Sequence, residues 1–377
     1  MSKRLLIFTE YFLPAKRGGG PVTSIRNLVE LLHSEYEIGI VCFNHDMNSE
    51  DELPGIISDD WNNWEEKARV FYAGKKSLKK NKIEGLIDEF SPEVIYINSI
   101  FVPQFLLYPI WKAEKIKSKV IVAPRGMLQD GAIENKPIKK KLYFSLLKAI
   151  GLFKNIYWHA TDNQEEIDIK KLFHSGNILE VKNVPVSPTN KLQQTEERST
   201  LRLLYLSLIS EKKNLHFLLN ILKENISRQI ELDIYGPIKD KAYWAECLNI
   251  IETLPENVKV KYQGEVAPEN ISDIFPKYHL FILPTLGENF GHAIFEALAN
   301  GIPVIISDKT PWKNLEERNV GFDLPLEDRR WVEILNSIKT EELISMRQDS
   351  LDFAKDYFEM GNFKEKYRYL FNIDPVN

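Results

Sequence analysis

Short apolar runs alternate with amphipathic segments along the first half of the chain. The runs are nearly continuous and rich in β-branched residues, as expected of parallel strands that helices cover on both faces. We predict strands at Leu5–Thr9, Ile38–Phe43, Val94–Asn98, Val120–Ala123, Ile156–Ala160 and Ile178–Val181. Helical spacing of apolar residues predicts helices at Val22–His33, Ile83–Phe90, Pro103–Ile116, Lys139–Leu152 and Gln164–Phe173. This alternation indicates βαβ units and a parallel sheet.

A polar segment, residues 186–200, interrupts this pattern. Its sequence, VSPTNKLQQTEERST, has almost no apolar residue, and prolines lie just before it and within it, which is typical of a linker. Beyond it we predict strands and helices at Leu201–Leu206, Leu215–Glu224, Leu232–Tyr235, Tyr243–Leu254, Val258–Tyr262, Leu280–Leu283, Ala293–Ala299 and Val304–Ile306. Residues 343–371 form an aromatic-rich helical pattern that must pack against another part of the chain.

These patterns predict an α/β fold with two doubly wound, Rossmann-like domains. We expect the first to span residues 1–185 and to be completed by a C-terminal helix at about 350–377, and the second to span residues 201–349. Ligands of open α/β sheets bind beyond the carboxyl ends of the strands. The sequence therefore predicts an enzyme with two substrates, one in each domain, facing a central cleft.

Composition narrows the class of protein. With 377 residues, of which 44% are hydrophobic and 27% charged, the chain can form two ordinary globular domains. The net charge of −5 argues against a protein devoted to nucleic acid. Cys42 and Cys247 match neither a disulfide framework nor a zinc spacing, which favours a reducing compartment. Because no apolar run suits a signal peptide or a spanning helix, we expect a cytoplasmic protein.

The segment Leu283–Asp308, LPTLGENFGHAIFEALANGIPVIISD, is the strongest candidate for chemistry. It predicts a strand, a loop that carries Glu288, and a helix that carries Glu296 among apolar residues. A bare charge on such a helix is costly, so Glu296 should be paired or ligand-bound. Eight helical positions span roughly 12 Å, about the length of a pyrophosphate between two sugars, and the intervening helix N-terminus favours anions. The alternative is a surface acid and an unrelated helical glutamate.

This segment, with ENFGHAIFE at 288–296 followed by EALANGIPVIISD and TPW, resembles the retaining glycosyltransferases of the GT-B fold, family 4. Further similar segments are YFLPAKRGGGPVTSIRNLVELL (11–32), APRGML (123–128), HAT (159–161), YLSLISEKKNL (205–215) and IYGP (234–237). The resemblance implies transfer of a sugar from a UDP- or GDP-sugar to a glycan or lipid-linked acceptor with retention of configuration. It also implies a role in surface polysaccharide (O-antigen or capsule) biosynthesis.

The resemblance assigns roles to matching positions. Glu288 would lie at the donor sugar hydroxyls as a catalytic residue, Glu296 would bind the ribose, and Lys213 would neutralise the pyrophosphate. The other donor-binding positions that it implies in this half are Gly236, Asn289, Phe290 and Gly291. Leu208 departs from the family, which usually has an arginine there that also binds the phosphates. Lys212, Arg125 or the amides of the glycine loop would then have to compensate, or donor binding would be weaker.

Two loops of the first half are further candidates. Gly19 and Gly20 precede Pro21, which suits the start of a helix, and glycines let the backbone approach a donor; the alternative is a simple turn. Arg125 follows a predicted strand, and we expect it to contact the acceptor or the donor phosphate as a catalytic residue. The alternative for Arg125 is an ion pair with a local acid.

Cofactor and membrane expectations follow from two other features. The chain has no Asp-x-Asp, the usual metal-binding pattern of nucleotide-sugar enzymes, so we expect no obligatory metal and no other cofactor. Residues 136–154, KPIKKKLYFSLLKAIGLFK, combine lysines with apolar residues. Such a helix can lie on an anionic membrane surface, here at the inner face, or can be a packed helix with a solvated basic face.

Two other functions remain compatible with the sequence. A nucleotide-sugar epimerase could use the same fold without an acceptor, and a non-catalytic subunit could bind a glycan or nucleotide, for which Leu208 is the only indication. We identify no side chain as a nucleophile. Since the donor bond is already activated, the protein mainly has to position the reactants and stabilise the phosphate charge.

Overall fold

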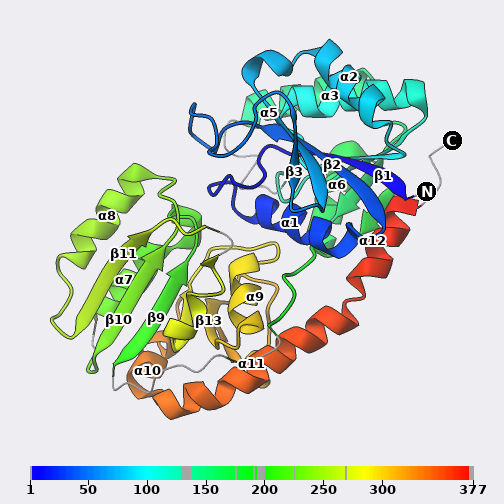
Figure 1. Cartoon of the computed structure of the whole chain (residues 1–377). Coiled ribbons are helices and arrows are strands. Elements are labelled where there is room, and N and C mark those ends of the chain that lie inside the picture. Colours follow the sequence, from blue (N-terminus) through cyan, green and yellow to red (C-terminus); the bar gives the residue numbers. More distant parts are fainter. Residues whose placement is uncertain are drawn as a thin grey trace. The chain divides into compact units, whose positions relative to one another are not determined.

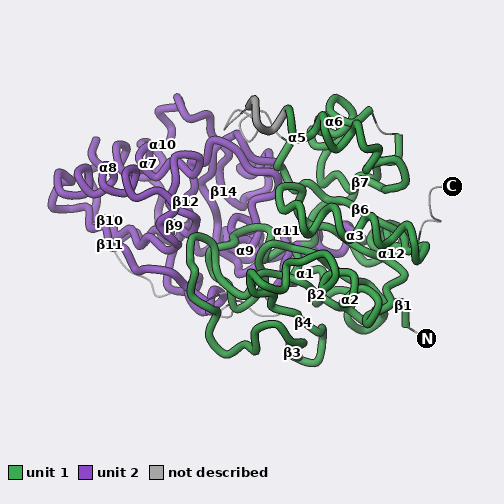
Figure 2. The backbone as a smooth tube through the Cα atoms, turned by 90° about the horizontal axis from the view of Figure 1, so that it is seen from above, with its two compact units in different colours: residues 1–184, 362–377 green, residues 185–361 purple. Residues whose placement is uncertain are grey.

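The computed structural model describes residues 2–128, 137–174, 176–189, 192, 200–224, 226–267 and 270–372. The chain divides into two compact units: unit 1 consists of residues 1–184 and 362–377, and unit 2 of residues 185–361 (Figure 2). Most of the predicted linker, residues 190–191 and 193–199, lies outside the described residues. Each unit contains its own sheet and core, and the two are described separately.

Unit 1 has an eight-stranded sheet in the order β3-β4-β2-β1-β5-β6-β7-β8, in which every neighbouring pair is parallel except β3 and β4. Strands β1, β2 and β3 are labelled in Figure 1. Its strands are β1 (Lys3–Phe8), β2 (Tyr36–Phe43), β3 (Trp61–Trp64), β4 (Ala68–Ala73), β5 (Val94–Ile97), β6 (Lys119–Val122), β7 (Tyr157–Ala160) and β8 (Ile178–Glu180). Its helices are α1 (Gly20–Leu32), α2 (Lys80–Phe90), α3 (Pro103–Ile116), α5 (Pro137–Ala149), α6 (Asn163–Phe173) and α12 (Phe363–Asn372).

Alternate residues of these strands face two different cores. Leu6 and Phe8 of β1 pack with apolar residues of α2, α3, α5 and α6, whereas Leu5 and Ile7 pack with α1 and α12. Helix α12, from the end of the chain, therefore covers one face of the unit 1 sheet. Two ion pairs of Glu35, with Lys364 at 2.7 Å and with Arg368, also hold this helix.

Unit 2 has a six-stranded parallel sheet in the order β11-β10-β9-β12-β13-β14. Its strands are β9 (Leu201–Leu206), β10 (Ile230–Tyr235), β11 (Val258–Gly264), β12 (Leu280–Leu283), β13 (Val304–Ser307) and β14 (Gly321–Leu324). Its helices are α7 (Leu215–Lys223), α8 (Lys241–Ile251), α9 (His292–Ala299), α10 (Arg330–Ser337) and α11 (Thr340–Met360). The strand order reverses between β9 and β12, which is the point where doubly wound folds bind their ligands.

The predicted α/β fold with two doubly wound units is confirmed. The sequence analysis did not predict the hairpin β3–β4, strand β14 or helix α10. In the part of the chain that the structure describes, no helix is both long and apolar enough to cross a membrane.

Candidate functional site

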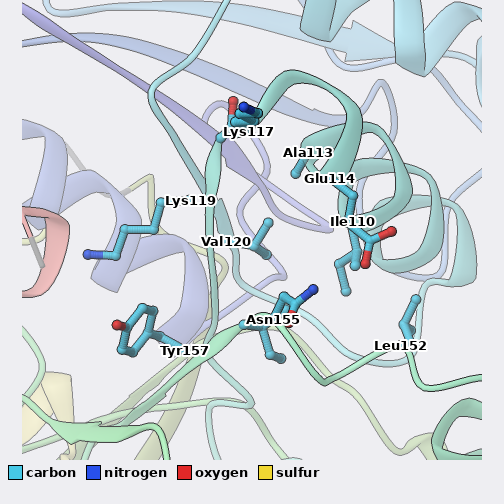
Figure 3. Close-up of a pocket in the computed structure, with 11 residues that line it drawn as sticks. Ile110, Ala113, Glu114, Lys117, Lys119, Val120, Leu152, Asn155 and Tyr157 are labelled. Carbon is cyan, nitrogen blue, oxygen red and sulfur yellow. The ribbon is translucent and has the colours of Figure 1, made fainter. Parts of the chain in front are cut away.

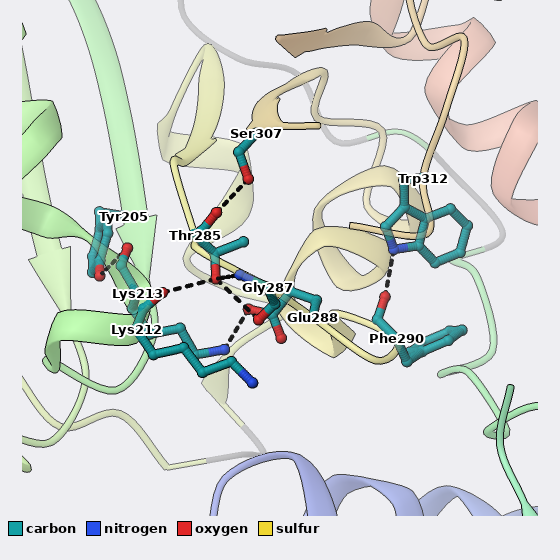
Figure 4. A network of polar contacts seen from close by, with 9 residues as sticks. All are labelled: Tyr205, Lys212, Lys213, Thr285, Gly287, Glu288, Phe290, Ser307 and Trp312. Atoms are coloured by element: carbon teal, nitrogen blue, oxygen red, sulfur yellow. Dashed lines mark hydrogen bonds and ion pairs between the residues drawn. The ribbon is translucent and has the colours of Figure 1, made fainter. Parts of the chain in front are cut away.

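The reversal point of unit 2 brings two loops together at the carboxyl edge of its sheet. One loop follows β9 and the other follows β12, and because these strands are parallel neighbours, both loops leave the sheet at the same edge. The loops are joined by hydrogen bonds: the carbonyl of Lys212 accepts from the amide of Leu286 at 2.8 Å and from the hydroxyl of Thr285 at 3.1 Å (Figure 4). Thr285 in turn accepts from the amide of Gly287 at 3.2 Å.

Lys213 and Glu288 meet across these loops as an ion pair, in which the ammonium group donates to Oε1 of Glu288 (Figure 4). The side chains are only 19% and 10% exposed. The backbone of both residues is fixed, since Tyr205 donates its hydroxyl to the carbonyl of Lys213 at 3.2 Å and the amide of Glu288 donates to the carbonyl of Lys309 at 3.1 Å. Two predicted donor-binding residues, 75 positions apart in the chain, are thus in direct contact.

Further lysines surround this pair. Burial lowers the pKa of Lys212; the charge of Glu288 acts to raise it, and the charges of Lys213 and Lys239 lower it further. Lys212 therefore lies within electrostatic range of Glu288, Lys213 and Lys239. Such a group has an excess of positive charge, which suits a ligand with several negative charges.

The loop after Glu288 is rigid where it enters α9. Gly291 has a φ of 78°, and a Cβ atom there would lie 2.8 Å from Cδ1 of Ile294, so glycine fits this position best. Trp312 donates its indole N–H to the carbonyl of Phe290 at 2.6 Å (Figure 4). The N-terminus of α9 therefore begins next to Glu288 with its first amides in a fixed place.

Glu296 lies in the middle of α9, as predicted. Its side chain is buried, and the residues around it in the helix, among them Phe295 and Ala297, are fully buried. A carboxylate in these surroundings has a strong need for polar partners. The ribose contact that the family resemblance implies for Glu296 stays a prediction.

Gly236 has a structural reason to be glycine. It follows β10 with a φ of 131°, and a Cβ atom would lie 1.9 Å from the carbonyl oxygen of Ser207, at the end of β9. Its amide donates to the carbonyl of Gly264 at 2.9 Å. Packing of the strand ends therefore explains this glycine without any ligand, and donor contact at Gly236 stays a prediction.

In unit 1, the predicted glycine loop leads into α1. Gly19 has a φ of 61°, and its carbonyl accepts from the amides of Val22 and Thr23 in the first turn. The carboxylate of Asp46 accepts from the amides of Lys16 and other loop residues, at 2.8 Å for Lys16. Gly20 is the first residue of the helix. The loop thus has a defined shape at the carboxyl edge of the unit 1 sheet.

The guanidinium group of Arg125 donates hydrogen bonds to three side chains at the carboxyl edge of the unit 1 sheet. It donates to Oδ1 of Asn98 at 2.7 Å, to the hydroxyl of Tyr96 at 2.6 Å and to Oδ1 of Asn183. All three acceptors are neutral. Burial acts to lower the pKa of Arg125, but the surrounding groups, among them the carboxylate of Glu165, raise it. The alternative of a pair with a local acid stays a prediction. Contact of Arg125 with a substrate stays a prediction.

His159 belongs to the same polar group and is neutral, with its proton on Nε2. The carbonyl of Val181 can only accept, so Nε2 of His159 carries the proton in their 2.7 Å hydrogen bond, and Tyr96 donates its hydroxyl to Nδ1 at 2.8 Å. Burial, together with the charge of Arg125, lowers the pKa of His159 to about 3. A neutral, buried histidine of this kind positions Tyr96 and through it Arg125.

Glu165 is a residue that the sequence analysis missed. Its fully buried carboxylate accepts from the amide of Gly126 at 2.6 Å, and from the amide and hydroxyl of Thr161 at 2.7 and 2.8 Å. Burial raises its pKa, and these hydrogen bonds oppose the rise. It fixes the loop that carries Arg125. The signal in the sequence is an acid three residues after Asp162, which caps α6.

The predicted site residues therefore fall into two groups. Unit 2 holds Lys213, Gly236, Glu296 and the run Glu288–Gly291, with Lys213 and Glu288 in contact, and unit 1 holds Gly19, Gly20 and Arg125. A cavity of about 640 Å³ in unit 1 lies elsewhere, between α3 and residues 152–157 near the start of β6, with Lys117, Leu152 and Asn155 in its wall (Figure 3). Among the described residues, no group of three or more His, Cys, Asp or Glu side chains is placed to hold a metal ion.

The family match of this chain lies in unit 2. Residues 188–342 match the model of the family Glycosyl transferases group 1, and this match indicates a transferase enzyme. The chain is 26% identical, over 203 residues, to the UDP-N-acetylglucosamine--peptide N-acetylglucosaminyltransferase GtfA subunit of Streptococcus agalactiae. That alignment covers 51% of this chain and 36% of the relative, so the chain spans less than half the length of this curated relative.

Solved structures resemble the whole chain at low identity. Anabaena HepE in complex with UDP and glucose has a TM-score of 0.69 and 15% identity, over 98% of this chain and 99% of that one. The apo form of the lipopolysaccharide outer core galactosyltransferase WaaB has a TM-score of 0.60 and 17% identity, with the same coverage. At these identities the likeness establishes the fold, which is that of the GT-B glycosyltransferases.

Proposed function

We propose that this chain is a glycosyltransferase that moves a sugar from a nucleotide-sugar donor to a glycan or lipid-linked acceptor, and that unit 2 binds the donor. The observation that carries the proposal is the contact of Lys213 with Glu288 at the reversal point of the unit 2 sheet. It lies in the part of the chain that matches the group 1 family. A cation, a carboxylate and a helix N-terminus in one place suit a ligand with a diphosphate and sugar hydroxyls.

The chemistry of such a transfer suits these groups. The bond between the anomeric carbon and the diphosphate oxygen breaks, and a bond to the oxygen of an acceptor hydroxyl forms, while the proton of that hydroxyl passes to the departing diphosphate. Negative charge develops on the leaving nucleoside diphosphate, and Lys213, Lys212 and the first amides of α9 can stabilise it. Glu296 would hold the ribose. We further propose retention of configuration, in keeping with the family 4 resemblance, and no need for a metal ion.

A UDP-sugar is the first donor to test, with a GDP-sugar as the alternative. HepE was solved with UDP and glucose, and the GtfA subunit is named for UDP-N-acetylglucosamine. A thermal-shift screen of the intact chain against UDP, GDP and dTDP would identify the base, because a ligand at 100 times its Kd adds about 2.7 kcal/mol of stability. Incubation with nucleotide sugars alone then tests the reaction. A transferase gives at most slow hydrolysis, whereas formation of a new nucleotide sugar would indicate an epimerase.

For the acceptor, we propose a lipid-linked saccharide at the cytoplasmic face of a membrane, as in surface polysaccharide synthesis. WaaB acts on lipopolysaccharide by its name, and helix α5 supports a membrane contact. Leu142, Leu146 and Ile150 recur every four residues and are 71%, 60% and 50% exposed, while Phe144 and Leu147 are buried. Residue 136 and the side chains of residues 137–141, which carry most of the predicted basic charge, lie outside the described residues.

Co-sedimentation with lipid vesicles tests this contact. We expect the chain to bind vesicles that contain anionic lipid and to lose binding when Leu142 and Leu146 are both changed to serine, because apolar area and charge act together at a membrane surface. The double variant should keep its melting temperature, since both side chains already face solvent. Equal binding by the wild-type chain and the double variant would contradict a role for α5.

A further inference from the structure

Two side chains that the family resemblance assigns to different parts of the donor bind each other in this structure. Lys213 is assigned to the pyrophosphate and Glu288 to the sugar hydroxyls, yet the ammonium group of Lys213 donates to the carboxylate of Glu288 (Figure 4). Neither group can serve the donor fully while this pair is closed, because the carboxylate neutralises the cation that a phosphate would need.

We propose that Glu288 is an internal anion that occupies Lys213 in the unliganded protein, and that the diphosphate of the donor displaces it. This rests on the proposed function, because it assigns the incoming anion to the donor. A diphosphate carries more charge than one carboxylate and can also reach Lys212, so it is the stronger partner for these cations. The displaced carboxylate becomes available to the hydroxyls of the donor sugar.

Once a phosphate binds Lys213, the carboxylate is disfavoured at the same ammonium group, because two anions there repel each other. The side chain of Glu288 has to move, but its backbone does not. Its amide is bonded to the carbonyl of Lys309, and the hydroxyl of Thr285 ties the loop to Lys212. The exchange is therefore a rotation of one side chain on a fixed loop.

This arrangement discriminates between ligands. A ligand without phosphate offers Lys213 no anion to replace the carboxylate, so Glu288 stays paired with Lys213. A ligand with a diphosphate exchanges one anion for another. Glu288 thus links the presence of the diphosphate to the availability of the group that contacts the sugar.

The experiment compares Glu288→Gln, which keeps the size of the side chain and removes its charge, with the wild-type chain by calorimetry. If Glu288 competes with phosphate, the variant should bind UDP and inorganic pyrophosphate about tenfold more tightly, while binding of uridine is unchanged. Glu211→Gln is the matched control, because Glu211 is an exposed acid in the same turn as Lys213 and its removal leaves the pair intact. In a Lys213→Gln background, Glu288→Gln should have no effect on pyrophosphate.

Other results would overturn the inference. Unchanged or weaker binding of both anions by Glu288→Gln, at an unchanged melting temperature, would show that the ion pair persists in the complex. The inference would also be overturned if Glu211→Gln tightened binding of these anions equally, since the effect would then come from the overall charge of the protein. If pyrophosphate binds more tightly to the variant but UDP binds neither protein, the proposed donor is wrong and the competition stands. If Glu288→Gln does not fold, Glu288→Ala takes its place with the same expected results.

Discussion

Replacing Gly236 by alanine should destabilise the carboxyl edge of the unit 2 sheet. The added Cβ atom would lie 1.9 Å from the carbonyl oxygen and 2.7 Å from the carbonyl carbon of Ser207, and both atoms belong to the backbone. The ends of β9 and β10 would have to separate. That movement strains two hydrogen bonds on either side of the contact, from Ser207 to Tyr235 at 3.1 Å and from Ile209 to Pro237 at 3.0 Å.

The magnitude follows from these contacts. Each strained backbone hydrogen bond contributes about 0.5–1.5 kcal/mol, and a positive φ costs a residue with a Cβ atom about 1–2 kcal/mol. Gly236 has a φ of 131°. We therefore expect a loss of about 2–5 kcal/mol, a large part of the 5–15 kcal/mol that is typical of a folded domain.

Hydrogen exchange read by mass spectrometry can localise this loss. We expect amides of β9 and β10 to exchange about 30-fold faster or more in Gly236→Ala, while unit 1 is unchanged and serves as the internal reference. Gly287→Ala is the matched control. It lies in the same site, the only atom of the described residues within 4 Å of an added Cβ is Cε of Lys212 at 3.8 Å, and its φ is not in the left-handed region. Normal protection in Gly236→Ala together with loss of UDP binding would refute the steric reasoning and favour a direct ligand contact at Gly236.

Four further predictions are independent of this one. Glu296→Ala should weaken UDP binding about tenfold or more in calorimetry, since a hydrogen bond to a charged group contributes about 1.5–3 kcal/mol; unchanged affinity would contradict the ribose contact. Leu208 is half-buried just after β9. Leu208→Arg restores the usual phosphate-binding arginine and should tighten UDP binding about tenfold. A lower melting temperature with unchanged affinity would show instead that the leucine is needed for packing. Transferase activity should survive EDTA, and full loss restored by Mn²⁺ would contradict this. Hydrogen bonds from Arg368 and Lys364 lower the pKa of Glu35 from 4.5 to about 2. The stability that they add is therefore complete above pH 4.5 and is lost as the pH falls towards 2. The difference in melting temperature between the wild-type chain and Glu35→Gln should narrow over that pH range, and a constant difference would contradict this role of the ion pairs.

The periodicity of apolar residues was sufficient to predict the doubly wound α/β fold. Buried parallel strands need apolar side chains on both faces, and their covering helices need one apolar face, so both leave a strong local signal. The hairpin β3–β4 left none that we could use. Trp61–Trp64, WNNW, has no apolar run, and it is a strand because it pairs with Ala68–Ala73 at the edge of the sheet.

In the candidate site, too, local sequence predicted some features and tertiary structure decided others. Local sequence was enough to mark Glu288 and Glu296, because the loop and helix that carry them are contiguous. The ion pair of Glu288 with Lys213 depends on the strand order, which places β12 beside β9. No local pattern encodes that order.

The polar group around Arg125 depends on tertiary structure to an even greater degree. Its partners Tyr96 and Asn98 lie at the end of β5, whereas Asn183 lies beyond β8, and these segments meet only because β5, β6, β7 and β8 lie side by side. Sequence could place the arginine at the end of a strand, but not decide what its guanidinium binds. A buried donor must find an acceptor, and which acceptor is near is set by the packing of strands that are distant in the chain.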